Sequence, residues 1–321
     1  MRQSGRNTSA ARAGPGKGAT AARDPNRRAS LSKPAAGHTL WEPAHELEPG
    51  LHLVATPIGN LGDITLRALW VLRGVDRIFC EDTRVTGQLL ARFGIGTPLD
   101  AYHDHNADRV RPLALAALRR GERLALVSDA GTPLLSDPGF KLVRAALDEG
   151  LPVTAAPGPS AAIDALILSG LPPDAFLFAG FLPPRATARR KALATWQNVA
   201  ATLIFYEGPS RVGAALADMR DVLGNRPAAI GRELTKRHEE VRRGSLAGLA
   251  THYRSDPPRG EVVIVVGPPE VAAPTDADID SQLDAKLARL SLRDAVAELA
   301  AETGLSRQTL YDRALVRRRG T

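Results

Sequence analysis

Three loops carry the residues of this sequence that are best suited to hold a small molecule. The apolar run at 124–127 leads directly into Ser128 and Asp129, inside the longer word Val-Ser-Asp-Ala-Gly-Thr-Pro. The apolar runs at 51–55 and 153–156 lead into similar loops rich in proline and glycine. In an open α/β sheet, the loops at the carboxyl ends of the strands form the ligand crevice. The three loops therefore predict one small-molecule pocket at a single sheet edge.

The elements that position these loops follow one another as strand, loop and helix. Expected strands are Leu51–Ala55, Arg77–Cys80, Pro98–Tyr102, Arg123–Val127 and Pro152–Ala156. Expected helices are Leu66–Leu72, Gly87–Arg92, Ala107–Arg120 and Phe140–Glu149, with Gly74, Gly94, Gly121 and Gly150 as left-handed caps at their ends. This alternation predicts an α/β fold with a five-stranded, largely parallel sheet.

A second α/β unit is expected to begin near Leu171. Its expected strands are Phe176–Ala179, Leu203–Tyr206, Ala228–Ile230 and Val262–Val266, and its expected helices are Ala186–Trp196 and Arg211–Leu223. The predicted division of the chain is a basic disordered tail at 1–48, α/β domains at 49–171 and 172–268, a linker at 269–281 and a helical segment at 282–321.

The formal charge of +7 lies in the first forty residues. That segment holds eight Lys or Arg against one Asp, and the rest of the chain balances 34 bases with 34 acids. A generally basic surface is therefore excluded for the body, and a nucleic-acid contact needs a local patch. The single cysteine, Cys80, fits a reducing cytoplasm, and the sequence contains no membrane-length apolar run and no zinc ligand set.

The last forty residues have the pattern of a helical pair, 292–302 and 307–317, around the turn residue Gly304. This spacing is typical of a helix-turn-helix. One interpretation is nucleic-acid contact through the arginines of the second helix, Arg307, Arg313, Arg317, Arg318 and Arg319. The other is a helical hairpin whose arginines are solvated, and the sequence favours neither.

Nine short words, in order, make the chain resemble the tetrapyrrole methylase superfamily, and within it the bacterial 16S rRNA ribose 2′-O-methyltransferases. They are Thr-Pro-Ile-Gly-Asn-Leu-Gly-Asp-Ile-Thr (56–65), Glu-Asp-Thr-Arg (81–84), His-Asp-His-Asn (103–106), Val-Ser-Asp-Ala-Gly-Thr-Pro (127–133), Asp-Pro-Gly (137–139), Pro-Gly-Pro-Ser-Ala (157–161), Gly-Phe-Leu-Pro (180–183), Leu-Ile-Phe-Tyr-Glu (203–207) and Arg-Glu-Leu-Thr-Lys (232–236). The resemblance covers about residues 50–267 and continues into the helical segment.

The resemblance implies two α/β domains with S-adenosylmethionine (SAM) in a cleft between them. It also implies methylation of a cytidine ribose 2′-hydroxyl in the decoding region of 16S rRNA, within the 30S subunit, by a cytoplasmic homodimer. The cofactor residues that it implies are Pro57, Gly59, Asp129, Gly131, Thr132, Leu135, Ser160, Ala161 and Ala162.

Three residues are candidates for the catalytic work of the implied reaction. His105 is a candidate acceptor for the hydroxyl proton, because a neutral histidine titrates near physiological pH. Asp82 is a candidate to orient it, and Lys236 is a rival acceptor. In the alternative interpretation, His105 and Asn106 only hold their loop in place.

Two basic clusters are candidates for RNA contact. The first holds Arg185, Arg189, Arg190 and Lys191, and the second holds Arg232, Lys236, Arg237, Arg242 and Arg243. Charge runs are also common on solvated faces, which is the alternative. Two further functions stay open at this point: a SAM-dependent methylase of a tetrapyrrole precursor, and a helix-turn-helix DNA-binding regulator.

Overall fold

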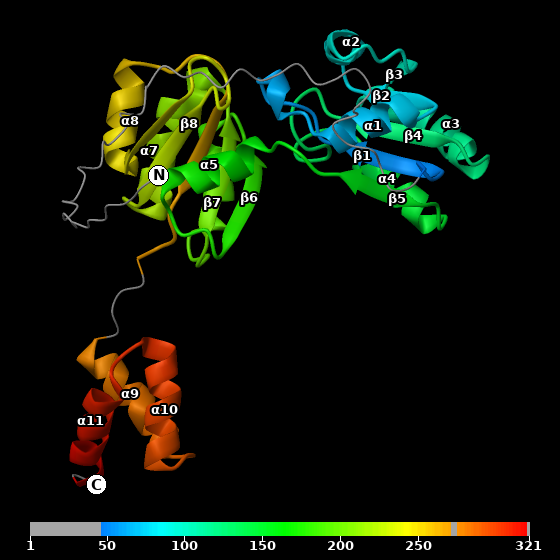
Figure 1. The fold of residues 1–321 in the computed structure, drawn as a ribbon. Helices are drawn as coiled ribbons and strands as arrows, with labels where there is room; N and C mark the ends of the chain where they lie inside the picture. Colours follow the sequence, from blue (N-terminus) through cyan, green and yellow to red (C-terminus); the bar gives the residue numbers. More distant parts are fainter. Residues whose placement is uncertain (1–45, 271–274, 320–321) are drawn as a thin grey trace, which may run out of the picture. The chain divides into compact units, whose positions relative to one another are not determined.

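The computed structural model describes residues 46–270 and 275–319. The predicted tail at 1–48 lies outside the described residues except for its last three. Two five-stranded sheets and a set of helices at the carboxyl end make up the described chain (Figure 1).

The first sheet is entirely parallel and has the order β3-β2-β4-β1-β5. Its strands are β1 (Gly50–Val54), β2 (Arg77–Cys80), β3 (Leu99–Ala101), β4 (Arg123–Val127) and β5 (Val153–Ala156), which confirms the five predicted strands. After β1 the chain crosses to β2, toward the β3 edge of the sheet. After β4, the neighbour of β1, the chain crosses to β5, at the opposite edge. Such a switch point is where open α/β sheets bind ligands.

Helices cover both faces of this sheet. They are α1 (Leu66–Gly74), α2 (Thr83–Arg92), α3 (Ala107–Arg119) and α4 (Phe140–Asp148). Leu124 and Leu126 of β4 belong to the same apolar cluster as Leu142 of α4, whereas Ala125 and Val127 belong to another cluster. This alternation is expected because successive side chains of a strand point to opposite faces. The prediction for Gly74 was wrong, since it closes α1 with a negative φ, whereas Gly94, Gly121 and Gly150 have positive φ.

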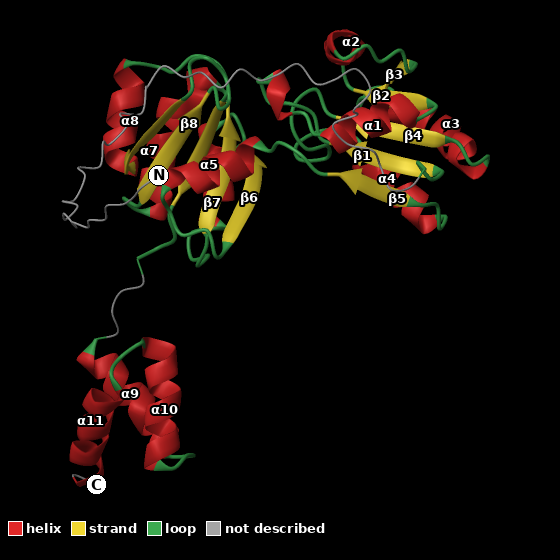
Figure 2. Ribbon diagram, in the orientation of Figure 1, coloured by secondary structure: helices red, strands yellow, loops and turns green. Residues whose placement is uncertain are grey.

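The second sheet is mixed and has the order β6-β7-β10-β8-β9. Its strands are β6 (Phe176–Phe181), β7 (Thr202–Glu207), β8 (Pro227–Arg232), β9 (Glu240–Ser245) and β10 (Val262–Val266). Its helices are α5 (Ala161–Ser169), α6 (Ala186–Ala194), α7 (Val212–Leu223) and α8 (Leu246–Ser255). Figure 2 shows the yellow strands of this sheet with their red helices. The sequence analysis missed β9 and α8.

Helix α5 follows the last strand of the first sheet but packs on the second. Its residues Ala162, Ala165 and Leu166 share an apolar cluster with Ile204 of β7 and Val265 of β10. Helices α6, α7 and α8 belong to the other large cluster of this sheet. The predicted boundary at 171/172 therefore does not separate the two packing units, because α5 contributes to the second one.

Three helices form the described carboxyl-terminal segment: α9 (Asp276–Leu287), α10 (Leu292–Thr303) and α11 (Arg307–Arg319). The predicted linker at 269–281 was wrong in its second half, because α9 begins inside it. A capping box between Thr275 and Asp278 starts that helix. Leu283, Leu299 and Leu310, one from each helix, are fully buried in their common core.

Candidate functional site

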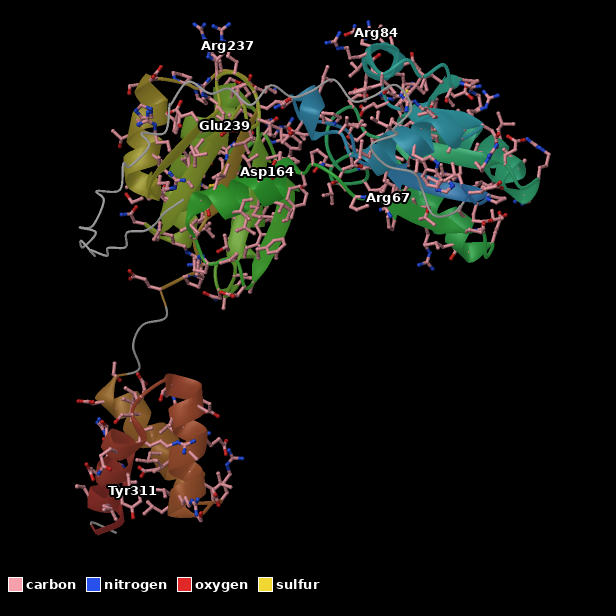
Figure 3. All side chains as sticks on the ribbon, in the orientation of Figure 1. Arg67, Arg84, Asp164, Arg237, Glu239 and Tyr311 are labelled. Atoms are coloured by element: carbon pink, nitrogen blue, oxygen red, sulfur yellow. The ribbon has the colours of Figure 1, made fainter. Side chains whose placement is uncertain are left out.

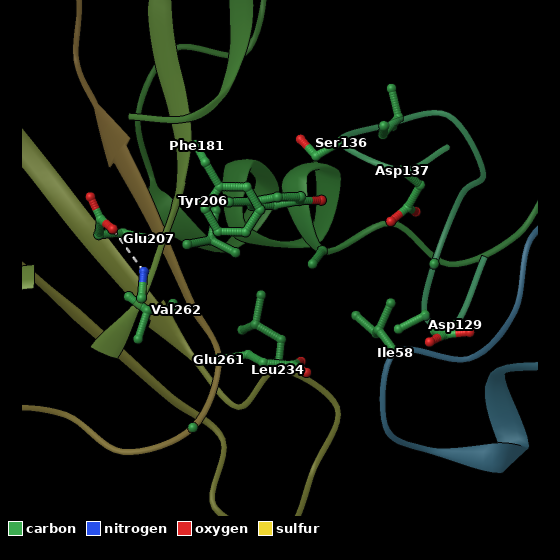
Figure 4. Close-up of a pocket in the computed structure, with 18 of the residues that line it drawn as sticks. Ile58, Asp129, Ser136, Asp137, Phe181, Tyr206, Glu207, Leu234, Glu261 and Val262 are labelled. Atoms are coloured by element: carbon green, nitrogen blue, oxygen red, sulfur yellow. Dashed lines mark hydrogen bonds between the residues drawn. The ribbon is translucent and has the colours of Figure 1, made fainter. Parts of the chain in front are cut away.

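A cavity of about 360 Å³ lies at the switch point of the first sheet, which is within the size range of small-molecule sites (Figure 4). Its walls come from the loops after β1 and β4, the start of α5 and the second sheet. The lining residues are Ile58, Asp129, Ala130, Gly131, Thr132, Leu135, Ser136, Asp137, Ala161, Phe181, Tyr206, Glu207, Gly208, Pro209, Gly231, Leu234, Gly260, Glu261, Val262 and Val263.

Backbone hydrogen bonds hold the three predicted loops together. Thr56 and Gly131 exchange N–H···O bonds of 2.9 and 3.0 Å, which joins the loops after β1 and β4. The Thr132 hydroxyl donates to the Pro159 carbonyl at 3.1 Å and adds the loop after β5. Gly131 has a φ of +81°, and a Cβ there would lie 3.2 Å from Ile58 Cγ2. The structure thus confirms that the three loops meet at one edge.

The β4–α4 loop is held in an unusual conformation where it lines the cavity. Leu134 and Ser136 both have positive φ, 73° and 70°, which residues with a Cβ seldom adopt. Backbone strain of this kind concentrates at functional sites, where the surrounding structure enforces it. This turn brings Asp137 back beside Ser128, whose hydroxyl donates to the Asp137 carboxylate at 2.6 Å.

All four charged residues that line the cavity are acids: Asp129, Asp137, Glu207 and Glu261. Figure 4 shows Glu207 pointing away from the cavity and Asp137 pointing toward it. Burial raises the pKa of Asp137; the Ser128 hydrogen bond lowers it, and the charge of Asp129 raises it further. Glu207 pairs with Arg211 and Glu261 pairs with Lys236. The negative charge that favours a cationic ligand therefore comes from Asp129 and Asp137, which form no ion pair among the described residues.

Five of the nine predicted cofactor residues line the cavity, namely Asp129, Gly131, Thr132, Leu135 and Ala161. The other four, Pro57, Gly59, Ser160 and Ala162, are not among the lining residues but are sequence neighbours of Ile58 or Ala161, which are. The Ser160 hydroxyl oxygen is buried and has no hydrogen-bond partner.

Lys236 does not line the cavity and is held by two carboxylates instead. Its Nζ donates to Glu233 at 3.0 Å and to Glu261 at 3.1 Å. Burial alone would lower the pKa of Lys236, but these two hydrogen bonds outweigh it and the pKa is raised. Lys236 as the proton acceptor therefore stays a prediction, and in this structure its ammonium group is bound by two carboxylates. The aliphatic part of the Lys236 side chain packs against Gly59, where a Cβ would clash with Lys236 Cγ.

The other two predicted catalytic side chains also lie outside the cavity lining. The Asp82 carboxylate accepts hydrogen bonds from the Arg84 side chain and backbone, and these lower its pKa to about 2. The Asp82 side chain caps α2 in this structure, and its role in orienting His105 stays a prediction. His105 is exposed and its ring lies 5.9 Å from that of His103. Asp82 reaches the site only through its backbone N–H, which donates to Asp129 at 3.1 Å.

The structure corrects the predicted RNA-binding set. Arg189 is buried, and its guanidinium pairs with the equally buried Asp218 at 2.6 Å, so it is not available to a phosphate. Arg190 pairs with Asp218 and Asp221, and Arg242 pairs with Glu240. By contrast, Arg185, Lys191 and Arg237 are exposed, and no ion pair forms with any of the three among the described residues. Figure 3 shows Arg237 pointing outward.

The arginines of α11 are also less available than their spacing indicated. Arg313 pairs with Asp276 and Asp280, and Arg317 pairs with Asp280 and Asp284, all on α9. Arg307 is exposed, and the side chains of Arg318 and Arg319 lie outside the described part. Part of the charge on α9 and α11 is therefore used in ion pairs between these two helices.

Tyr206 and Glu261 were not predicted as cavity residues, and Asp137 was predicted only as part of the loop after 124–127, without a role in the site. Asp137 and Tyr206 stand in words that carried the family resemblance, Asp-Pro-Gly and Leu-Ile-Phe-Tyr-Glu, but those words gave no side-chain direction. Burial raises the pKa of Tyr206, and the negative charge of Asp137 adds to this. Figure 4 shows both side chains projecting into the cavity.

Comparison with known proteins decides the family. The family described as tetrapyrrole (corrin/porphyrin) methylases matches residues 50–250, and the one described as RsmI C-terminal HTH domain matches residues 273–318. The chain belongs to the tetrapyrrole methylase family. Two relatives, both named ribosomal RNA small subunit methyltransferase I, are each 53% identical to this methylase. The protein of Mesorhizobium japonicum aligns over 85% of this chain and 94% of its own, and that of Erythrobacter litoralis over 85% and 96%.

Solved structures of other methylases share the fold. Cobalt precorrin-4 methyltransferase has a TM-score of 0.53 at 17% identity and covers 68% of this chain and 94% of its own. Diphthine synthase has a TM-score of 0.54 at 14% identity and covers 68% and 89%. This methylase is thus a SAM-dependent methyltransferase of the two-sheet class.

The cavity fits the cofactor of this family in charge and in size. SAM carries a sulfonium and an ammonium group against one carboxylate, and the charged lining of the cavity is acidic. The unpartnered Ser160 hydroxyl lies next to Ala161 in the wall and offers a further polar contact. Among the described residues there is no cluster of metal-binding side chains, and no helix is long and apolar enough to cross a membrane.

Proposed function

We propose that this methyltransferase methylates the 2′-hydroxyl of a cytidine ribose in the decoding region of 16S rRNA. The observation that carries the proposal is the 53% identity, over 275 residues, to a relative named ribosomal RNA small subunit methyltransferase I. The nine sequence words that resemble the ribose 2′-O-methyltransferases support the finer assignment to ribose.

The acidic cavity supports a role in binding SAM in preference to neutral molecules of similar shape. When bound, SAM supplies an electrophilic methyl group. Asp129 and Asp137 stabilise the positive charge of the cofactor, and the paired loops of Thr56 and Gly131 form a wall against which it is positioned. Positioning of this kind contributes on the order of 7–11 kcal/mol to transfer reactions when the reacting atoms are well aligned.

Three exposed cations support a contact with the RNA backbone. Arg185 is the N-cap residue of α6, Lys191 lies in the last turn of the same helix, and Arg237 lies in the loop between β8 and β9. Contacts to phosphate fix the register of a nucleic acid on a protein, while the reacting nucleotide must be unstacked to reach a buried site. We infer that these side chains hold the rRNA strand on either side of the reacting ribose.

The proposal also includes the 30S subunit as the substrate, a cytoplasmic location and a homodimeric state. An rRNA substrate within the 30S subunit requires a protein that works where subunits are assembled. Phe140 and Leu147 lie seven residues apart on α4, so they share a face of the helix, and their exposed fractions of 68% and 55% offer apolar area to a second copy. Light scattering of the purified protein measures the oligomer directly.

The test supplies methyl-labelled SAM with one of four substrates: 30S subunits, free 16S rRNA, a DNA duplex or uroporphyrinogen. The proposal expects label in the 30S subunits. After alkaline hydrolysis the label should remain in a dinucleotide that contains cytidine, because a 2′-O-methyl group protects the adjacent phosphodiester bond. Label in uroporphyrinogen would favour a tetrapyrrole methylase instead. Binding to DNA without any methyl transfer would favour the regulator.

A further inference from the structure

Among the carboxylates that line the cavity, Asp137 is the one best placed to accept a proton from a bound substrate. Its side chain is partly buried and projects into the cavity opposite Tyr206 (Figure 4). No ion pair with a lysine or arginine neutralises it among the described residues. Its negative charge is therefore available to a group that enters the cavity.

The hydroxyl group of Ser128 can satisfy Asp137 in both of its protonation states. Ser128 Oγ lies 2.6 Å from Asp137 Oδ2 and 2.8 Å from the carbonyl oxygen of Ala130. When Asp137 is ionised, the Ser128 proton points to the carboxylate. When Asp137 is protonated, it donates to Ser128 Oγ, and the Ser128 proton turns to the Ala130 carbonyl. Ser128 is itself buried, which restricts its hydroxyl proton to these two orientations.

The charged groups around Asp137 also favour proton uptake. Asp129, from the same loop, and Glu81, which follows β2, place negative charge near it, and Tyr206 faces it from β7. Burial and the charge of Asp129 act together to raise the pKa of Asp137 toward the range of an effective general base.

We propose that Asp137 is the general base, which accepts the proton of the ribose 2′-hydroxyl during methyl transfer. The assignment rests on the proposed function. The O–H bond breaks and its proton moves to the Asp137 carboxylate, while the ribose oxygen forms a bond to the methyl carbon. The bond from that carbon to sulfur breaks, and sulfur keeps the electron pair as a neutral thioether.

The direct test is the single-turnover rate of the Asp137→Asn variant with 30S subunits at saturating SAM. Removal of a general base is expected to lower the rate by about 10²–10⁴-fold. The wild-type rate should rise with pH and reach a plateau when Asp137 is ionised. The variant should show no such plateau, because hydroxide must then remove the proton. The matched control is Asp256→Asn, at an exposed aspartate that follows α8, does not line the cavity and forms no ion pair among the described residues; it should leave the rate unchanged.

Ser128→Ala gives a second test that does not depend on loss of the carboxylate. Without the donor hydroxyl, the ionised form of Asp137 loses a hydrogen bond, and its pKa rises further. The pH at which the rate reaches its plateau should therefore move upward. A rate that falls without any movement of the plateau would contradict the proposed role of Ser128.

Calorimetry gives a readout that does not depend on turnover. Binding of cationic SAM should lower the pKa of Asp137, so at mildly acidic pH the wild-type protein should release protons into the buffer. Asp137→Asn should still bind SAM, which shows that it is folded, but should release fewer protons. Equal proton release by both proteins would count against the assignment.

The two proposals fail in different ways. Wild-type protein that labels no ribose would overturn the proposed function and, with it, the substrate of this step. Wild-type protein that labels ribose, matched within about threefold by Asp137→Asn at every pH, would overturn only the role of Asp137.

Discussion

Two carboxylates of the cavity, Asp129 and Asp137, differ in their electrostatic situation from three carboxylates of α9. Asp276, Asp280 and Asp284 on α9 are each paired with Arg313 or Arg317 of α11. Asp129 and Asp137, in contrast, line the cavity and form no ion pair among the described residues. The difference indicates that the first group fixes a helix against its neighbour, while the second is left for a cation that the protein binds.

The largest expected effect concerns a carboxylate that is both paired and buried. Arg189→Ala removes the buried partner of Asp218, which is itself buried, and leaves it only the more exposed Arg190. Breaking a buried ion pair costs about 3–5 kcal/mol of the free energy of unfolding, and the remaining Arg190 places the expected loss at the lower end of this range. Chemical denaturation measures this loss. Arg189→Met combined with Asp218→Leu should recover much of it, and a single variant as stable as the wild type would contradict the pairing.

A smaller effect is expected when charge is removed from the cavity. Asp129→Asn keeps an oxygen that can accept from the Asp82 N–H but removes the negative charge. The loss of an interaction with a charged partner, about 1.5–3 kcal/mol, corresponds to SAM affinity weakened by roughly 10–150-fold. Calorimetry should show a smaller loss for the demethylated product, which lacks the sulfonium charge. Equal losses for both ligands would remove the electrostatic explanation.

The next effect concerns the affinity for RNA and its dependence on salt. If the three exposed cations Arg185, Lys191 and Arg237 contact phosphates, the salt slope for a single strand is about −2, so binding should weaken about twentyfold between 50 and 200 mM salt. Filter binding with the rRNA fragment measures this slope. Arg237→Ala should reduce the magnitude of the salt slope by about 0.7, the contribution of one phosphate contact. Arg189 is buried and contributes nothing to the slope. A flat salt response would contradict the phosphate contacts.

The smallest effect is expected on α9. Asp280→Asn removes one partner each from Arg313 and Arg317, at a partly exposed surface position where ion pairs contribute little. The melting temperature of the helical segment should fall slightly, and the affinity for SAM should not change. Loss of SAM affinity in this variant would break the distinction between the two groups of carboxylates.

Much of the first α/β domain was predictable from the sequence because its inner strands β1, β2 and β4 are mainly apolar and almost entirely buried. Strand β9 was not, since Glu240–Ser245 is a charged edge strand with few apolar residues. Helix α9 was missed for a related reason: its first residues, Asp-Ala-Asp, are as typical of a linker as of a capped helix start.

The site was predictable at the level of loops but not of side chains. The meeting of three strand ends follows from parallel topology alone. The pairing of Ser128 with Asp137 does not, because it depends on the left-handed turn at Leu134 and Ser136. Arg189 was misassigned because a run of basic residues does not reveal which of them faces a buried acid on another helix.

Calorimetric titration of the folded protein with SAM is the most direct test, since the roles of Asp129 and Asp137 depend on a cationic ligand in this cavity. The account predicts saturable binding of SAM, which Asp129→Asn combined with Asp137→Asn weakens more for SAM than for its demethylated product. No heat of binding in a well-folded sample, or unchanged affinity in the double variant, would contradict it.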